Sequence, residues 1–255
     1  MRSNFTIFMM VLALIIVLFL SVPLIKLFVG VGTEKFFETL QDKEVLDAIW
    51  LTMRVAFYAT VFVFFTGIPL AYLIARHDFL GKSLLETMID IPVMVPHTAA
   101  GIALLTVFGS ASVGETLSSV GLDFIDGQTG IMAAMMFLSA PFLINSAKDG
   151  FRKVDSKLEK VARTLGASAY GAFFKIAIPN ARKDIVNGAL MMWSRGLGEF
   201  GAVVILAYHP MTAPVLIYDR FTSYGLVESA PVAATMIAVS IVVFLVIRTI
   251  NNRLK

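Results

Sequence analysis

Long uninterrupted runs of apolar residues alternate with short polar segments along the chain. An α-helix rises about 1.5 Å per residue, so about 20 apolar residues cross the hydrocarbon core of a bilayer. The pattern predicts an all-α membrane protein with six transmembrane helices in a single domain, residues 1–255. We place these helices at residues 5–25, 55–75, 89–108, 131–147, 185–208 and 230–247.

The first apolar run also has the character of a secretory signal peptide. It is longer than the apolar part of such a peptide usually is, and no small-x-small cleavage site follows it. We therefore expect it to stay attached as the first spanning helix.

Prolines interrupt two of the predicted spans. Asp90, Pro92 and Pro96 stand at the start of the third span and predict a broken or kinked helix there, and Pro141 predicts a kink in the fourth. Residues 110–130 hold no Lys or Arg and are rich in Gly and Ser, which indicates a loop. The apolar spacing within residues 30–47 predicts a short surface helix.

Residues 148–183 form a charged insert in this apolar sequence, and a short amphipathic helix is predicted inside it. Ser156 followed by Glu159 is a capping box, and Asp155 adds negative charge at the helix start. Apolar residues then follow at helical spacing in one narrow stripe: Leu158, Val161, Ala162 and Leu165.

Two residues set the expected ends of helices in the insert. Gly166 can adopt the left-handed conformation that stops a helix, and Pro179 is expected to end a second short helix. The apolar stripe needs a surface that covers it. Three surfaces are possible: lipid headgroups, the chain's own bundle or a partner protein.

Composition narrows the function classes. The chain is 58% hydrophobic and 15% charged, with a mean hydropathy of +0.82, far from a soluble globular protein. It has no cysteine, and its three histidines lack metal-ligand spacing. The sequence contains no G-x-x-x-x-G-K-S/T phosphate loop. We therefore expect neither a metal site nor a catalytic centre, and the modest net charge of +3 does not favour nucleic acid as a partner.

The distribution of lysines and arginines predicts the orientation in the membrane. The insert carries most of them, and Arg2, Arg76, Lys82 and the C-terminal residues up to Lys255 lie on the same predicted side. The other side holds mainly Lys35, Lys43 and Arg220. Because positive loops stay in the cytoplasm, we expect both termini and the insert to be cytoplasmic.

A pair of opposite charges lies inside the predicted fifth span. Arg195 and Glu199 are four residues apart, where an isolated charge is costly, so they are expected to meet in the bundle or beside water. Gly196, Gly198 and Gly201 remove bulk around them, and Ser194, Gly198 and Ala202 form a small-residue row suited to helix packing. The pair is either a structural ion pair on a packing face or part of an anion path.

The proline-broken start of the third span is a second candidate for anion contact. Backbone N–H groups there, with His97 and Thr98, present possible donors to an oxyanion. A kink that only sets the helix angle is the alternative.

The insert resembles the cytoplasmic EAA loop of permease subunits of ATP-binding-cassette (ABC) importers. Glu159, Ala162 and Gly166 match the pattern, and nine residues later Ile176 to Pro179 close it. Lys160, Val161 and Ile178 depart from it. The blocks IPVMVPHTAAGIALL, VARTLGAS, WSRGLGEFGAVVILAYHPMTAPVLIYDRF and GLVESAPVAAT are similar to molybdate/tungstate permeases.

This resemblance implies a type I ABC importer permease fold in the cell membrane. It implies a homodimer, two separate ATPase subunits that bind ATP and Mg, and an extracytoplasmic binding protein for molybdate or tungstate. The chain itself would then be no enzyme and carry no cofactor. The ATPase-coupling residues implied are Leu158, Glu159, Val161, Ala162, Leu165, Gly166, Ile176 and Pro179.

Several alternatives stay open at this stage. Sulfate permeases share the LGEFGAV core, so a sulfate or thiosulfate importer is the nearest competitor. A membrane scaffold would lack the polar and helix-breaking residues within the spans, and an ion-coupled transporter would usually show internal repeats. The translocation-path candidates are Thr98, Arg195, Gly198, Glu199 and Gly201.

Overall fold

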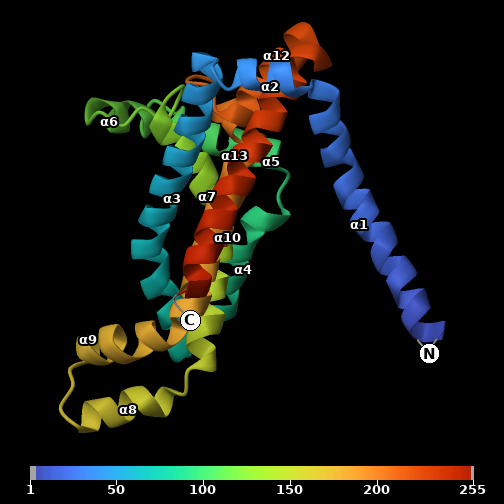
Figure 1. Cartoon of the computed structure of the whole chain (residues 1–255). Coiled ribbons are helices and arrows are strands. Elements are labelled where there is room, and N and C mark those ends of the chain that lie inside the picture. Colours follow the sequence, from blue (N-terminus) through green and yellow to red (C-terminus); the bar gives the residue numbers. More distant parts are fainter. Residues whose placement is uncertain (1–3, 254–255) are drawn as a thin grey trace. The chain divides into compact units, whose positions relative to one another are not determined.

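The computed structural model describes residues 4–253, and every regular element among them is helical (Figure 1). The elements are α1 (Asn4–Val31), α2 (Thr33–Thr39), α3 (Lys43–Arg76), α4 (Lys82–Met94), α5 (His97–Phe108), α6 (Gly114–Ser119), α7 (Gln128–Lys153), α8 (Ser156–Thr164), α9 (Ala169–Ala172), the π-helical stretch η1 (Phe173–Ala177), α10 (Ile178–Leu197), α11 (Val203–Leu206), α12 (Ala213–Tyr224) and α13 (Leu226–Arg253). The predicted all-α class is confirmed for these residues. Arg2 and Lys255, on which the predicted placement of the termini depends, lie outside them.

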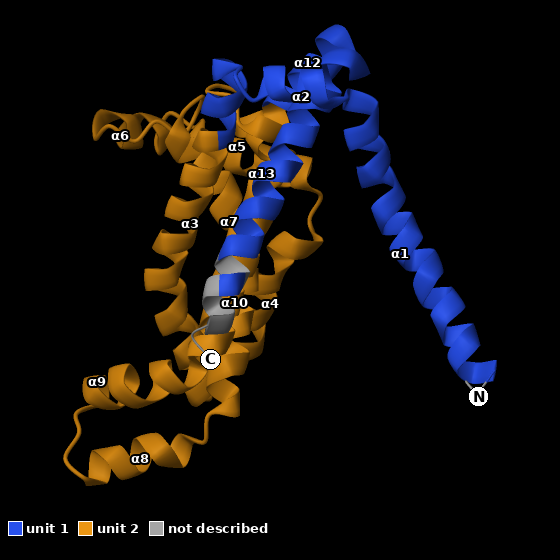
Figure 2. Cartoon of the chain, viewed as in Figure 1, with its two compact units in different colours: residues 1–49, 216–255 blue, residues 50–215 orange. Residues whose placement is uncertain are grey.

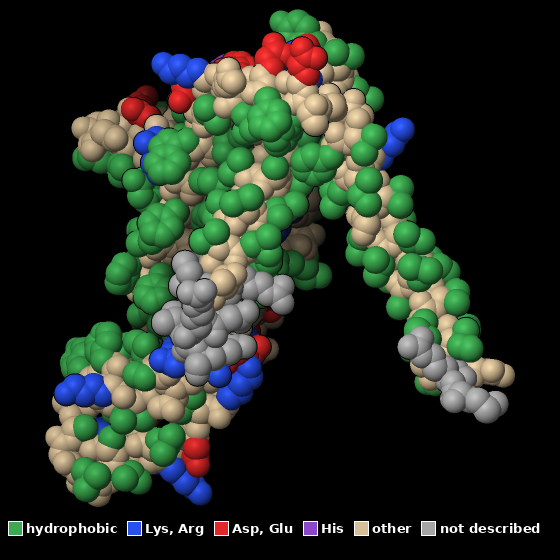
Figure 3. All heavy atoms as spheres, viewed as in Figure 1, with side chains coloured by type: hydrophobic (Ala, Val, Ile, Leu, Met, Phe, Trp, Pro, Cys, Tyr) green, Lys and Arg blue, Asp and Glu red, His purple; other side chains and the backbone are tan. Residues whose placement is uncertain are grey.

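The chain divides into two compact units, coloured separately in Figure 2. Unit 1 comprises residues 1–49 and 216–255, and unit 2 comprises residues 50–215. In unit 1, α13 contacts both α1 and α2. None of the residues of α1 is buried, and its side chains are almost all apolar (Figure 3), as expected of a helix that faces lipid.

Unit 2 is built around α7, which contacts α4, α5, α10 and α11. Small residues let α7 and α10 approach closely: a Cβ added at Gly188 would lie 2.7 Å from the Cβ of Ser146, and one at Gly150 would lie 2.6 Å from the Cβ of Asp184. The Ser146 hydroxyl also donates to the Asp184 carbonyl at 2.7 Å. Close small-residue contacts with a hydrogen bond between helices are the usual means of packing in a membrane.

The predicted spans agree with the helices over most of the chain. Among the described residues, four helices are long and apolar enough to cross a membrane: α1, α3, α7 and the part of α13 up to Val246. The pair α4 and α5 meets the same test as a broken span, bent by 114° at residues 95–96. The break that Pro92 and Pro96 predict is therefore confirmed.

The predicted fifth span, residues 185–208, is wrong as a continuous helix. Helix α10 ends at Leu197, a turn follows, and α11 is a separate four-residue helix. The amide of Glu199 donates to the carbonyl of Gly196, and the Glu199 carboxylate accepts from the amide of Ala202, so this turn is closed by its own side chain. Ser194, Gly198 and Ala202 therefore do not form a row on one helix.

The polar connections differ from the prediction in one segment and agree with it in another. The segment expected to be a loop at residues 110–130 contains α6, and the surface helix expected within residues 30–47 is α2.

In the insert, Asp155 rather than Ser156 is the N-cap residue of α8. Its carboxylate accepts from the amide of Lys157 at 2.9 Å, so the predicted capping box is not formed. Gly166 has φ +93° just after α8, which confirms the predicted stop.

Pro179 does not end a helix, contrary to the prediction. The chain stays helical from α9 through η1 into α10, where Pro179 lies in the first turn. The helix is continuous here, so the missing N–H of Pro179 has to be accommodated inside it. The π-helical stretch η1 precedes it and changes the hydrogen-bond register at this junction.

A close contact between α5 and the segment before α11 yields a test of the fold. A Cβ added at Gly101 would lie 2.9 Å from the Cα and carbonyl oxygen of Ala202, which are backbone atoms. Gly101→Ala is therefore expected to destabilise the chain by about 1–3 kcal/mol, as overpacking does. The measurement is the thermal unfolding midpoint of the purified protein in detergent.

Gly198→Ala is the matched control. A Cβ at Gly198 would have no neighbour within 4 Å, so the midpoint should stay unchanged. An equal drop for both substitutions would mean that the α5 contact is not tight.

Candidate functional site

Three polar side chains meet where α5 begins and α10 ends. His97 is the first residue of α5, Arg195 lies in the last turn of α10, and Glu199 lies in the turn that follows. Arg195 Nη1 is 3.3 Å from Glu199 Oε2, and His97 Nδ1 is 3.0 Å from the same oxygen. Arg195 Nη2 is 2.6 Å from His97 Nε2 and 3.1 Å from Nδ1. We call these three residues the anion cluster, because contact with an anion is one of the two roles that the sequence leaves open for them.

The close contacts in the cluster differ in kind. A guanidinium only donates hydrogen bonds, so the imidazole nitrogen nearest Arg195, Nε2, acts as the acceptor. Glu199 Oε2 lies within ion-pair distance of both Arg195 and His97, but it accepts no hydrogen bond from the described residues. The buried oxygen is therefore held by charge and proximity rather than by a hydrogen bond.

The members of the cluster differ in exposure. The Glu199 side chain is 1% exposed, whereas those of Arg195 and His97 are 29% and 38% exposed. The acid is thus the buried anchor, and the guanidinium and the imidazole are accessible. A buried carboxylate in this position requires partners, which explains why all three groups converge.

The sequence-predicted path residues fall into two groups. The expected contact between Arg195 and Glu199 is present, and Gly201 lies against the cluster, since a Cβ there would be 2.6 Å from the Cβ of His97. Thr98 is exposed and, within residues 4–253, forms no hydrogen bond with the charged groups, and Gly198 borders open space. The role of His97 as partner of both charges was not predicted, because it lies 98 residues from Arg195 in the sequence.

The amphipathic helix of the insert exposes its stripe. Figure 2 shows α8 and α9 projecting from one end of unit 2, and Figure 3 shows Lys and Arg side chains gathered around them. Leu158, Val161 and Leu165 are exposed, and Ala162 is partly exposed. The chain's own bundle therefore does not cover Leu158, Val161 or Leu165. Lipid headgroups and a partner protein remain as the surfaces that could cover the stripe.

Other expected coupling residues are also accessible. Gly166 and Pro179 are exposed, and Ile176 is partly exposed. Two large aromatic residues nearby, Tyr170 and Phe174, are 77% and 60% exposed and were not predicted from the sequence. They extend the exposed apolar surface of the insert beyond α8.

Glu159 behaves differently from the other predicted coupling residues. It is the only buried residue of α8, and its carboxylate binds Tyr72 and Arg76 near the end of α3. Sequence periodicity offered no signal for these contacts, because the partners lie 87 and 83 residues away.

A further polar seam joins α4 and α7. Asn145 donates to Asp90 at 2.6 Å, and Glu86 pairs with Lys148 at 3.2 Å and with Arg152 at 2.7 Å. Sequence analysis did not predict this seam. It holds the broken span against the central helix of unit 2.

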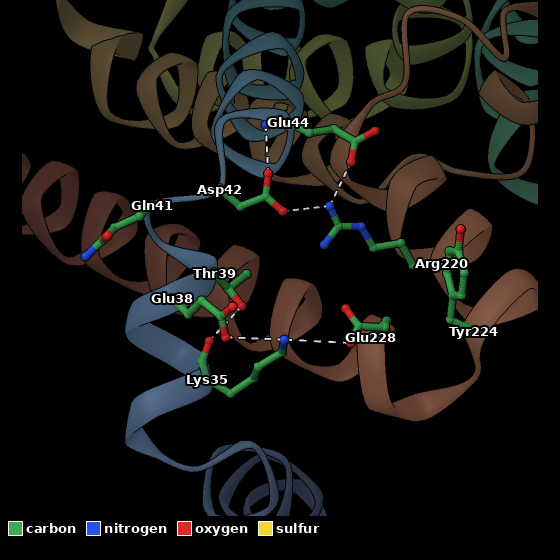
Figure 4. A pocket seen from close by; sticks show the side chains of 9 residues that line it. All are labelled: Lys35, Glu38, Thr39, Gln41, Asp42, Glu44, Arg220, Tyr224 and Glu228. Carbon is green, nitrogen blue, oxygen red and sulfur yellow. Dashed lines mark hydrogen bonds and ion pairs between the residues drawn. The ribbon is translucent and has the colours of Figure 1, made fainter.

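Unit 1 contains a polar pocket of about 750 Å³ (Figure 4). Arg220 contacts Asp42 and Glu44, each at 2.7 Å, and Lys35 contacts Glu38 and Glu228. Burial is the largest single effect and raises the pKa of Asp42. The hydrogen bond and the charge of Arg220, together with the backbone N–H groups of Glu44 and Val45, outweigh it and lower the pKa below the usual value. The stabilisation from this pair is thus lost only as the pH falls through that lowered pKa.

Most of the chain matches one known protein family. The family described as "Binding-protein-dependent transport system inner membrane component" matches residues 67–255. The chain belongs to this family. It is a multi-pass membrane permease of the ABC importer type.

Relatives of this permease cover almost its whole length. The molybdate/tungstate transport system permease protein of Thermococcus kodakarensis is 39% identical over 99% of both chains. The protein of the same name from Methanocaldococcus jannaschii is 38% identical over 96% of both chains. A probable sulfate transport system permease protein of Chlorokybus atmophyticus is 29% identical over 81% of this chain and 74% of its own.

Solved structures confirm the type I importer permease fold. A bacterial ABC transporter that imports the polysaccharide alginate matches with a TM-score of 0.76 at 20% identity, covering 98% of this chain and 96% of its own. A methionine ABC transporter matches with a TM-score of 0.61 at 16% identity, covering 82% and 94%. These likenesses concern the fold alone.

The anion cluster of the permease yields a stability test. Arg195→Ala removes the cation beside a fully buried acid, and losing one partner of a buried pair costs about 3–5 kcal/mol. The double variant Arg195→Ala, Glu199→Ala removes both charges and is expected to be the more stable of the two. The measurement is the thermal midpoint and folded yield of each variant in detergent.

Thr98→Ala is the control, because Thr98 is exposed beside the cluster and should leave the midpoint unchanged. Equal and small effects of the single and double variants would mean that water screens both charges.

Proposed function

We propose that this permease carries molybdate or tungstate across the cell membrane into the cytoplasm. The observation that carries the proposal is the 38–40% identity, over nearly the whole chain, to archaeal permeases named for these anions. Relatives named for sulfate are less similar and match less of the chain. A sulfate importer is therefore the second candidate.

The anion cluster fits a passage for a tetrahedral oxyanion. The accessible guanidinium of Arg195 offers two forked donors, a geometry suited to oxyanions. Glu199 balances its charge, which keeps a passing anion from binding too tightly to leave. Gly201 and Gly198 provide space beside it, and Thr98 at the start of α5 is a further donor.

Transport in this proposal is driven by ATP on separate subunits. The exposed stripe of α8 would fit a groove of an ATPase that binds ATP and Mg, with Ala162, Gly166, Ile176 and Pro179 completing the docking surface. One chain offers one coupling helix, so a two-ATPase motor requires two copies of the permease. The bundle would then alternate between outward-open and inward-open states.

A binding protein would deliver the anion from outside. The family is defined by dependence on such a protein, and a solved relative of the same fold is described in complex with a periplasmic protein bound to alginate. In this proposal the insert and both termini are cytoplasmic, which the positive-inside asymmetry of the sequence supports. Lipid surrounds the spans, and neither a cofactor nor nucleic acid has a role.

Uptake by the reconstituted transporter tests the anion. Labelled tungstate is supplied to liposomes holding the permease and its ATPase, with the binding protein and ATP present. Competition by molybdate but not by sulfate is expected. Competition by sulfate would favour the second candidate, and uptake without ATP would contradict the ATP-driven mechanism.

Disrupting the exposed stripe tests the docking of the ATPase. Leu158→Asp puts a charge in the middle of an apolar surface and is expected to abolish co-purification with the ATPase subunit, while membrane insertion is kept. Lys157→Asp changes the neighbouring exposed position, which lies outside the stripe. It should bind the ATPase subunit much more tightly than Leu158→Asp does. Normal uptake by Leu158→Asp would contradict the proposed role of α8.

A further inference from the structure

The helix that presents the exposed stripe is tied to unit 2 through one buried side chain. Glu159 is the only buried residue of α8, with a side chain 9% exposed. Its Oε1 accepts from Arg76 Nε at 2.8 Å and lies 2.7 Å from Arg76 Nη2. Its Oε2 accepts from the Tyr72 hydroxyl at 2.5 Å. Both carboxylate oxygens are therefore bound to α3.

Arg76 also holds the segment that leads into α8. Its Nη2 donates to the carbonyl of Val154 at 3.0 Å, two residues before α8 begins. The side chain of Arg76 is 11% exposed. One guanidinium thus fixes both the start of α8 and its first turn, and a bidentate planar group of this kind constrains direction as well as distance.

Tyr72 connects the same point to two other elements. Its ring contacts Phe151 at the end of α7 with centroids 5.3 Å apart, and Phe173 in η1 with centroids 4.7 Å apart. Both contacts are edge-to-face, and such pairs add to the burial of aromatic surface. Helices α3, α7 and α8 and the stretch η1 therefore meet at Tyr72, Arg76 and Glu159, which we call the joint.

A buried ion pair of this kind adds little net stability, because removing two charges from water offsets most of their attraction. It does fix geometry, since either charge left alone is strongly unfavourable. Such a contact transmits a displacement as a rigid unit, whereas the exposed stripe of α8 has no comparable attachment.

We propose that Glu159 is a positioning residue that makes the coupling helix and α3 move together during transport. The inference rests on the proposed function, in which an ATPase displaces α8. The joint stays closed through the cycle, so displacement of α8 turns α3 directly and reaches α7 and η1 through Tyr72. Glu159 accordingly acts within this chain and does not serve as a contact to the ATPase.

A reversible covalent bridge tests the joint. The chain has no cysteine, so the double variant Arg76→Cys, Glu159→Cys carries the only two thiols of the permease. In the assembled transporter this variant should still hydrolyse ATP but move about tenfold fewer anions per ATP, a change within the usual range of coupling between sites. A bis-methanethiosulfonate crosslinker that spans the gap forms a disulfide with each cysteine and releases a sulfinate at each end, so it needs no oxidant. This bridge should restore the number of anions moved per ATP, and reduction of its disulfides should abolish the effect again.

Each single-cysteine variant treated with the same reagent is the matched control and should not be rescued. If the ratio of the double variant equals that of the wild type before crosslinking, or if the bridge fails to restore it, the joint does not transmit the motion. Loss of co-purification with the ATPase would also contradict the inference, because it would make Glu159 a docking residue.

Milder substitutions guard against a folding defect. Glu159→Gln and Tyr72→Phe keep the size of each side chain and should lower the anions moved per ATP without loss of assembly. The double variant Arg76→Glu, Glu159→Arg exchanges the two charges. It should move more anions per ATP than either single variant does. If the wild type itself moves no anion, the proposed function fails. If the wild type transports the anion and these variants move as many anions per ATP as it does, only the inference about the joint fails.

Discussion

The cost of an unpaired charge within a lipid-embedded bundle governs where the polar groups of this chain lie. Glu199 is almost completely buried, and both Arg195 and His97 are held against it. To bring them together, α10 must stop at Leu197, and α4 and α5 must break at residues 95–96. The irregular backbone in unit 2 is thus the structural condition for a partly accessible arginine, which suits the proposed passage of an anion.

The same constraint operates at the other end of α10. Helix α10 spans 20 residues, or about 30 Å at 1.5 Å per residue, between the insert and the anion cluster. At the insert, Glu159 is satisfied inside the chain by Tyr72 and Arg76, while Leu158 and its stripe remain exposed. One face of α8 is therefore fixed to the bundle and the other is free for a partner, which is what a mechanical coupling element requires.

The sequence predicted features that depend on nearby residues. The apolar run of α1, the break at Pro96 and the stop at Gly166 all follow from local pattern and backbone freedom. It did not predict pairs far apart in the chain, such as Glu159 with Arg76 or His97 with Arg195. The rule that proline ends a helix also failed, because a π-helical stretch is uncommon and the sequence did not predict it. With η1 directly before it, Pro179 lies within a continuing helical segment.

The central claim is that the insert of this permease binds an ATPase subunit and the membrane-spanning helices carry the anion. Photo-crosslinking from a reactive amino acid at position 158, in membranes that contain the assembled transporter, tests it most directly. The account predicts one main product that contains this chain and the ATPase subunit, formed whether or not anion is present. Products with lipid alone, or none with the ATPase, would contradict it.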